Sequence, residues 1–275
     1  MKKLLILFLC IFISSCAHRP RITFEKQIIT TEAEAPVPVK IEEPAPSLEI
    51  GENLTYAVDW IGVPSGYITL ETKEITKIGD RDAYHVIAKA LPNKFFRFFY
   101  DVEYSVHTYI DTQTLKPLRF YKQRRHKKTM AYETIDFFYP EGKAVWKDSE
   151  GNEMKELSLP QNPQDLLSSL YYFRLVKEIK VGEKFPVDII YNGRSWPSVL
   201  MVDKIAGVEI SKCAKFKAML IAPSTELATY ITGFKSIQTY LSTDKKRVPL
   251  IFRMRTKIGS LSGVLMSDSL CKNSN

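Results

Sequence analysis

The sequence predicts a mainly β protein, built as a large curved antiparallel sheet or half-open barrel with one short covering helix. Three observations lead to this prediction. After Gly51, apolar and polar residues alternate with a period of two, turn residues recur between these segments, and a single stretch shows helical spacing instead. With 275 residues, 45% of them hydrophobic and 12% aromatic, the chain can bury a substantial core.

Residues 1–15 have the pattern of a lipoprotein signal peptide. Met1-Lys2-Lys3 gives a basic start, and residues 4–13 form an apolar run that is too short to span a bilayer comfortably. Ile13-Ser14-Ser15-Cys16 is typical of a lipobox, so we expect cleavage before Cys16 and palmitate-like acyl chains on that cysteine, enough for stable anchoring. Ala17 follows where, in lipoproteins that this leader resembles, an aspartate would favour the inner membrane. We therefore expect an outer-membrane lipoprotein that faces the periplasm.

Residues 16–48 read as the lipidated cysteine and a flexible tether. This stretch is rich in Pro and Glu and poor in spaced apolar residues. Fully stretched it would reach roughly 100 Å, and relaxed on the order of 30 Å. Residues 17–50 hold six acidic and four basic side chains, so the chain's net charge of +8 is concentrated further along. We expect one basic β-rich domain over residues 49–270 and a tail over 271–275.

The first strand of the domain shows the alternation clearly. Leu54, Tyr56, Val58 and Trp60 share one face, and Gly62-Val63-Pro64-Ser65-Gly66 follows as a turn. Asn192-Gly193 is the strongest hairpin signal in the chain. The same pattern predicts further strands at 68–72, 84–88, 104–111, 117–125, 129–138, 144–148, 185–191, 196–205, 215–222, 234–242, 249–258 and 261–267.

One segment predicts a helix of about three turns. Asn162-Pro163-Gln164-Asp165 combines a capping residue, a proline suited to a first turn and an acid near the positive helix end. An apolar stripe follows, made of Leu166, Leu167, Leu170, Tyr171 and Phe173. The stripe favours a structural plug for one end of the core, and a movable gate over a cavity is the alternative.

Four stretches of the sequence belong together: Gly51-Glu52-Asn53-Leu54-Thr55-Tyr56, Trp60-Ile61-Gly62-Val63-Pro64-Ser65-Gly66, Asp165-Leu166-Leu167-Ser168-Ser169-Leu170-Tyr171-Tyr172-Phe173-Arg174, and Arg247-Val248-Pro249-Leu250 leading to Lys257-Ile258-Gly259-Ser260-Leu261. Together they resemble a bacterial exported family, domain of unknown function 3108. The resemblance covers residues 50–268. It implies a curved sheet distantly similar to the periplasmic lipoprotein carriers LolA and LolB, with helical cover over a hydrophobic concavity. It implies no ligand residues.

No catalytic signature is present in the sequence. His85, His107 and His126 fall on two strands and a hairpin tip without metal-ligand spacing, and no nucleophile elbow or phosphate-binding glycine loop occurs. Ser242-Thr243-Asp244-Lys245 spells S-x-x-K, but it sits in an expected turn and lacks the companion motifs. We therefore expect no enzyme, no metal and no cofactor, with an unrecognised hydrolase as the remaining alternative.

Two cysteines remain in the domain once the leader and the lipidated residue are set aside. Cys213 and Cys271 would form a disulfide in an oxidising compartment, which would fasten the tail to the strand near residue 213. Two free thiols are the alternative. Spacing alone leaves both open.

Two kinds of surface feature could contact a partner. Basic turns are expected at Arg124, Arg125, Lys127 and Lys128 and at Lys245, Lys246 and Arg247. Such turns are usually only solvated, and lipid headgroups or an anionic cell-wall polymer are the alternative. The connection at 93–100 contains Phe95, Phe96, Phe98 and Phe99, which would either cap the core or form the lip of a hydrophobic mouth.

The sequence thus favours a membrane-anchored periplasmic lipoprotein that binds a lipid or another hydrophobic ligand in the concave face of its sheet. We expect Phe95, Phe96, Phe98, Phe99, Leu170, Tyr171 and Phe173 at the entrance. The alternative is a structural or adaptor lipoprotein of the cell envelope, with a packed core, that binds a protein or polymer through its basic turns. Its expected partners are the membrane, through Cys16, and a hydrophobic ligand or envelope component. Nucleic acid is excluded by export.

Overall fold

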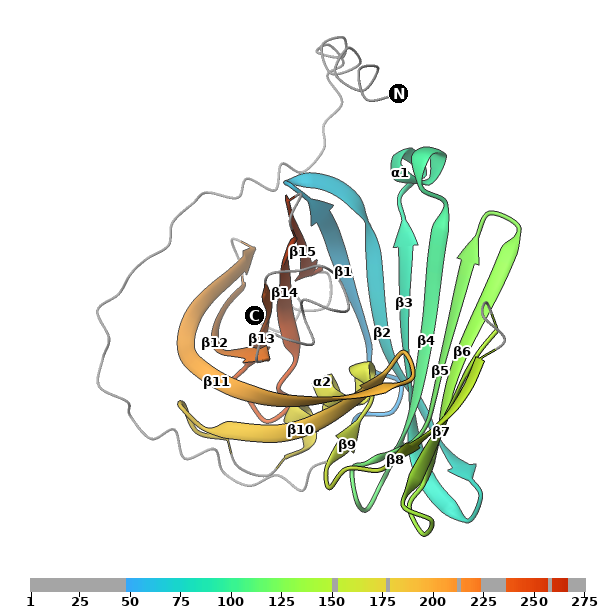
Figure 1. Ribbon diagram of the computed structural model, residues 1–275. Coiled ribbons are helices and arrows are strands. Elements are labelled where there is room, and N and C mark those ends of the chain that lie inside the picture. The colour runs from blue at the N-terminus through green and yellow to red at the C-terminus, as the bar shows by residue number, and fades with distance from the viewer. Residues whose placement is uncertain are drawn as a thin grey trace. The chain divides into compact units, whose positions relative to one another are not determined.

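The computed structural model describes residues 48–149, 153–176, 179–211, 214–223, 236–256 and 259–266. The strands of these residues form one curved 15-stranded sheet, which confirms the predicted fold class (Figure 1). The first arm of the sheet comprises β1 (Asn53–Trp60), β2 (Val63–Ile78), β3 (Arg81–Pro92), β4 (Val102–Asp111), β5 (Pro117–His126), β6 (Thr129–Phe138), β7 (Lys143–Asp148) and β8 (Glu153–Ser158). The second arm comprises β9 (Pro163–Gln164), β10 (Lys184–Tyr191), β11 (Arg194–Ser211), β12 (Ala214–Pro223), β13 (Ser236–Ser242), β14 (Pro249–Thr256) and β15 (Gly259–Leu265).

The strand order shows how the two arms are joined. It runs β8-β7-β6-β5-β4-β3-β2-β1-β15-β14-β13-β12-β11-β10-β9, and neighbours are antiparallel except β9 and β10. The chain therefore runs outward from β1 to the edge strand β8, re-enters at the other edge and returns strand by strand. Its first and last strands pair in the middle, with Tyr56 opposite Leu265.

The second arm curls around the concave face until it contacts the first (Figure 1). The β10–β11 turn makes this contact, because the Asn192 N–H donates to Glu133 Oε1 of β6 at 3.1 Å. Asn192 and Gly193 both have positive φ, as a type I′ turn requires. A Cβ on Gly193 would lie 2.9 Å from Trp146 Cε3, so glycine also permits the close approach to β7. The predicted hairpin is confirmed.

Helix α2 (Leu166–Leu175) lies on the concave face and contacts β4, β9 and β10. The predicted helix is confirmed, but its predicted start is wrong. Pro163 belongs to β9, and the Asn162 side chain donates to Pro186 O. Asp165 is the N-cap: its Oδ1 accepts from Leu167 N and Ser168 N, both at 2.8 Å. An aspartate whose carboxylate reaches two free amides caps the helix better than an asparagine bonded elsewhere.

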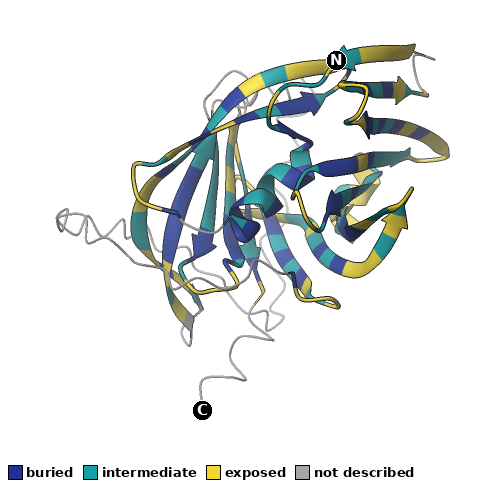
Figure 2. Ribbon diagram, turned by 90° about the horizontal axis from the view of Figure 1, so that it is seen from below, coloured by how far each residue is buried: buried dark blue, intermediate teal, exposed yellow. Residues whose placement is uncertain are grey.

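The helix divides the apolar interior between the two arms. Tyr171 and Leu175 pack with residues of β1–β4, β14 and β15, and Phe173 packs with β10–β13. A third cluster surrounds Phe120 and Trp146 on β5 and β7. Figure 2 shows that many residues of the strands around α2 are buried. The predicted role of the helix as a plug agrees with this packing.

Two arginines fix the carboxyl end of α2. Arg174 makes a bidentate pair with Glu52, at 2.6 and 2.7 Å, and its side chain is only 3% exposed. Arg247, from the β13–β14 turn, donates to the carbonyls of Phe173 and Val176, where the helix leaves carbonyls without helical partners. The prediction that Arg247 is a basic surface residue is therefore wrong: it is 2% exposed.

A second helix, α1 (Lys94–Phe99), lies in the β3–β4 connection, where no helix was predicted. Asn93 is its N-cap and accepts from Phe96 N at 2.9 Å. None of its six residues is buried. The aromatic connection therefore does not cap the core.

Several predictions fall outside the described residues, namely the signal peptide, the lipidation of Cys16, the tether and the Cys213–Cys271 disulfide. Within the described residues, no helix has the length and apolar character needed to cross a membrane.

Candidate ligand-binding site

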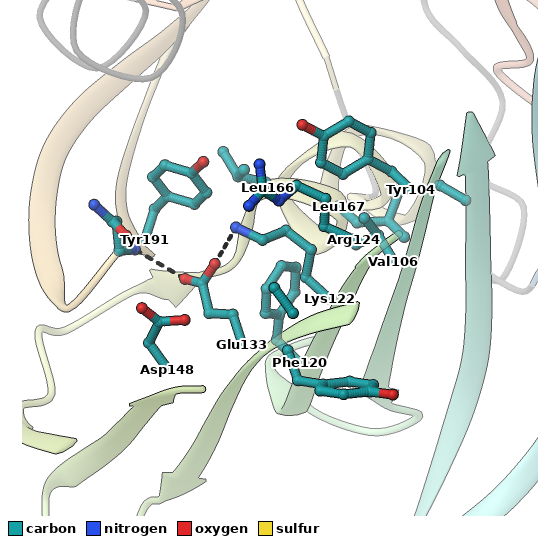
Figure 3. A pocket seen from close by; sticks show the side chains of 14 residues that line it. Tyr104, Val106, Phe120, Lys122, Arg124, Glu133, Asp148, Leu166, Leu167 and Tyr191 are labelled. Atoms are coloured by element: carbon teal, nitrogen blue, oxygen red, sulfur yellow. Dashed lines mark hydrogen bonds and ion pairs between the residues drawn. The ribbon is translucent and has the colours of Figure 1, made fainter. Parts of the chain in front are cut away.

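A cavity of about 500 Å³ lies on the concave face between the first arm, the start of α2 and the β10–β11 turn (Figure 3). Each wall comes from a different part of the chain. Its lining residues are Ala88, Tyr104, Val106, Phe120, Lys122, Arg124, Ala131, Tyr132, Glu133, Asp148, Leu166, Leu167, Tyr191 and Asn192. The volume falls within the range of small-molecule sites in proteins.

Part of the wall is apolar. Val106 and Phe120 come from adjacent strands, and Leu166 and Leu167 come from the first turn of α2. Phe120 is buried beneath the cavity and packs into the third core cluster. This wall can therefore exclude water from an apolar group.

The opposite part is charged and centres on Glu133, which is 3% exposed. Its carboxylate accepts from Trp146 Nε1 at 2.8 Å and from the Asn192 amide. It also forms an ion pair with Lys122 (Figure 3). The Lys122 ammonium also lies 5.0 Å from the centre of the Tyr191 ring. One buried carboxylate thus connects β5, β7 and the second arm.

The alternation of β6 explains why Glu133 faces inward. Ala131, Glu133, Ile135 and Phe137 occupy successive inward positions, and all four are buried. On β5 the same rule turns Phe120, Lys122 and Arg124 toward the cavity. The sequence prediction missed these residues, although a glutamate among inward apolar positions was a usable signal.

Burial shifts the pKa of two acidic groups near the cavity. Burial raises the pKa of Tyr104, and the neighbouring Tyr100 adds to this, so its phenol stays a neutral donor at physiological pH. Burial also raises the pKa of Asp165 to about 6, although its hydrogen bonds to Thr108 and to the first turn of α2 act to lower it. The Thr108 hydroxyl donates to Asp165 Oδ2 at 2.5 Å.

A second cavity, of about 210 Å³, lies on the other side of α2. Its walls come from α2 and strands β10–β14, and they are almost entirely apolar. It is lined by Leu166, Ser169, Leu170, Phe173, Ile189, Leu200, Ile221, Pro223, Ile237, Thr239, Leu241 and Phe252. Leu166 lines both cavities, so the first turn of α2 separates them.

The structure separates the residues predicted to form one entrance. Leu170 and Phe173 line the smaller cavity, whereas Tyr171 is fully buried in the main core and lines neither. The α1 phenylalanines also line neither cavity. These are Phe95, Phe96, Phe98 and Phe99. The prediction that α1 and α2 share an entrance is therefore wrong, because the α1 residues line neither of these cavities.

The basic stretch at 122–128 is only partly a hairpin tip. Arg124 lines the large cavity, and Arg125 forms ion pairs with Glu103 and Asp101 on the opposite face of β5. Lys127 and Lys128 form the exposed turn that was predicted. In the other basic turn Lys245 is exposed, and Lys246 forms an ion pair with Glu49 at 2.6 Å.

Two histidines that the sequence placed apart meet on the convex face. His85 Nε2 and His107 Nδ1 lie 2.9 Å apart, and Ser105 Oγ lies 3.0 Å from His107 Nε2. Burial lowers the pKa of both imidazoles. A usable signal in the sequence was that the two histidines lie on strands joined by a single connection, because such strands often pair. No group of three or more metal-ligating side chains occurs within the described ranges.

Comparisons with known proteins place this chain by family. A crystal structure of a beta-barrel-like protein of domain of unknown function DUF1849 from Brucella abortus is 11% identical, with a TM-score of 0.47 over 78% of this chain and 94% of that chain. No curated protein matches the chain. The predicted similarity to LolA and LolB stays a prediction. Residues 55–266 match the family model described as "Protein of unknown function (DUF3108)", and the chain belongs to this family.

Proposed function

We propose that this chain is a lipid-anchored protein of the cell envelope, facing the periplasm, that binds an amphipathic, lipid-like molecule in the concave face of its sheet. The observation that supports this most directly is the large cavity, where an apolar wall and a charged wall meet. Anchoring and location rest on the leader and Cys16.

The apolar wall suits a hydrocarbon group. Val106, Phe120 and the leucines of the first α2 turn surround one side of the cavity. Each methylene moved from water into such a site gains roughly 0.8 kcal/mol. A short stretch of acyl chain would therefore supply most of the affinity.

The charged wall suits a polar head that carries both signs. Lys122 and Arg124 bring two positive charges to the cavity, and Glu133 and Asp148 bring two negative ones. A ligand with a single charge would lie beside side chains of the same sign as well as of the opposite sign. A zwitterionic head can instead place each of its charges beside a side chain of opposite sign. A phospholipid with one acyl chain has both required parts.

The structure favours this proposal over the adaptor alternative. That alternative needs exposed basic turns, but Arg247 is buried under the end of α2. Arg125 and Lys246 are ion-paired with acidic neighbours. The charge left for a polymer is therefore smaller than the sequence suggested.

Native mass spectrometry of the full chain in mild detergent tests the proposal. The protein is offered lysophosphatidylethanolamine, and we expect one bound lipid per chain. A variant Ala131→Phe places a ring in the large cavity and should abolish uptake, whereas Ile75→Phe, at a 51% exposed position near the end of β2, should bind as the parent does. Failure of the parent to take up this lipid or a fluorescent fatty acid would refute the proposal.

A second variant separates the large cavity from the small one. Leu170→Phe fills only the smaller cavity, which Leu170 lines without reaching the larger. We expect it to keep binding. Loss of uptake in Leu170→Phe, with retention in Ala131→Phe, would move the site to the other side of α2.

A further inference from the structure

Helix α1 lies at one end of the sheet (Figure 1). Its phenylalanines form an exposed aromatic cluster, and they line neither of the two cavities. Phe98 is 85% exposed, Phe99 69% and Phe95 65%. Their rings contact one another edge to face, with centroids 5.1 to 5.3 Å apart. We use "aromatic tip" for α1 with Tyr100 and the neighbouring β1–β2 turn, which adds the exposed side chains of Trp60, Ile61 and Val63.

The aromatic tip is held in a defined conformation. Asn93 donates through its backbone amide to Ser65 O at 2.9 Å and through its side chain to Pro64 O at 2.6 Å. The rings of Trp60 and Phe96 also meet edge to face. Specific hydrogen bonds therefore present the phenylalanines to solvent.

The core of the domain does not require these aromatic residues. No residue of α1 is buried, and the helix packs mainly beside β2 and β3. Scattered exposed apolar residues are ordinary, but a contiguous patch of this kind usually marks an interaction surface.

The charges beside the patch indicate which partner it fits. The Lys127 amide donates to Asp101 O, which places the β5–β6 turn next to the end of α1. Lys94, Lys127 and Lys128 are exposed, and no ion pair involves them within the described ranges. The acids at this end, Asp101 and Glu103, are already paired with Arg97 and Arg125.

Exposed aromatic rings flanked by unpaired lysines are typical of surfaces that enter the interface of an anionic bilayer. We propose that the aromatic tip docks into a phospholipid bilayer, with the phenylalanines among the upper acyl chains and the lysines at anionic headgroups.

The course of the chain is compatible with this orientation. Strand β1 runs from Asn53 toward Trp60, so the described chain enters the domain at the end opposite the tip. Eight residues of strand span about 27 Å. The residues between Cys16 and Leu48 would reach roughly 100 Å when stretched. An anchor at Cys16 and the tip could therefore both reach one membrane.

A local depth probe tests the proposal independently of the anchor. The full chain is reconstituted in vesicles of phosphatidylethanolamine and phosphatidylglycerol, with an environment-sensitive fluorescent amino acid in place of Phe98. The matched control carries the probe in place of Ile75, which is 51% exposed near the other end of β2. We expect a blue shift and quenching by bromolipids at position 98 only.

Two outcomes of the probe experiment would overturn the proposal. One is equal access of aqueous iodide to positions 98 and 75 in the presence of vesicles. The other is a blue shift at position 98 that depends on protein concentration without vesicles, which would make a second copy of the chain the occupant.

Binding measurements complete the test. In full chains carrying Cys16→Ser, the double variant Phe98→Ser/Phe99→Ser should bind vesicles at least tenfold more weakly, whereas Ile75→Ser should not. The substitutions Lys127→Gln and Lys128→Gln should each weaken vesicle binding roughly fivefold, and they should reduce the salt dependence of binding. Unchanged binding by the double variant would overturn the proposal. Its lipid uptake in the cavity should be normal, so the two proposals fail separately.

Discussion

Helices α1 and α2 have similar local sequences and opposite surroundings. Both are short and aromatic, both begin at an Asx N-cap in extended conformation, and both carry an arginine in the last turn. Yet six of the ten residues of α2 are buried and none of the six in α1 is. The difference arises from position, because α2 lies inside the concave face and α1 lies at the end of the β3–β4 connection. Aromatic content alone therefore does not tell a plug from an exposed tip.

The largest difference in stability should appear between substitutions of the last-turn arginines, Arg174 in α2 and Arg97 in α1. Arg174→Met leaves Glu52, whose side chain is only 10% exposed, without its partner, so we expect a loss of about 3–5 kcal/mol in the free energy of unfolding. Arg97→Met removes pairs in which the arginine is 48% exposed, and it should change stability by less than about 0.5 kcal/mol. Urea titrations measure both. Equal losses would show that α2 is not held by its buried pair.

The aromatic side chains should differ almost as much. Phe173→Ala removes a ring from the second core cluster and should cost about 3–5 kcal/mol. Phe98→Ala removes an exposed ring and should leave the free energy of unfolding within about 0.5 kcal/mol of the parent value. Thermal and urea unfolding provide the measurement. A large loss from Phe98→Ala would mean that α1 supports the core after all.

The contribution of Asp165, the buried N-cap of α2, to the free energy of unfolding should depend on pH. The pKa of Asp165 is about 6 in the folded state and near 4 in the unfolded chain, so between these values the folded state binds the proton more tightly. Its contribution to stability is therefore full below about pH 4 and is lost as the pH rises through 6. Compared with Asp165→Asn, the parent should gain on the order of 2 kcal/mol between pH 7 and pH 4.

Measuring this difference between parent and variant cancels the opposing effect of His85 and His107. Because their folded pKa values are lowered, their contribution is full above about pH 6.5 and falls on acidification. A parent that loses stability relative to Asp165→Asn on acidification would contradict the raised pKa.

The smallest effect should come from the cap of α1. Asn93→Ala removes one capping bond and the bond to Pro64 O, and we expect a loss of about 1 kcal/mol or less. It should also loosen the aromatic tip and weaken vesicle binding by a few fold. Fluorescence of a probe in place of Phe98 would report this, and a rigid tip in Asn93→Ala would show that the backbone bond to Ser65 O and the Trp60–Phe96 contact are enough to fix it.

Much of the fold could be predicted because its signals are local. Alternation placed Leu54, Tyr56 and Val58 on one buried face, and the positive φ values that Asn192-Gly193 can adopt marked the hairpin that closes the sheet. The helix at 166–175 followed from its apolar stripe. Each of these features depends on neighbours within a few residues.

The site could not be predicted in the same way, because its walls come from segments far apart in the chain. Glu133 accepts hydrogen bonds from Trp146 and Asn192, and Asn192 lies 59 residues away in the sequence. In the sequence, Arg247 has the pattern of an exposed turn residue. Only the tertiary structure shows its contact with the end of α2, which lies more than 70 residues earlier in the chain. The sequence pattern predicted the α1 phenylalanines at a cavity entrance, but the structure shows that they do not line the large cavity.

By itself the sequence determined a mainly β domain, its hairpins and one helix, and it predicted a lipid anchor, because periodicity, turn residues and a cleavage signal act over short stretches. The tertiary structure alone decided which inward faces meet across the curled sheet. That choice depends on where two arms of one sheet contact, and it makes one aromatic helix a buried wall between two cavities and leaves the other exposed to solvent.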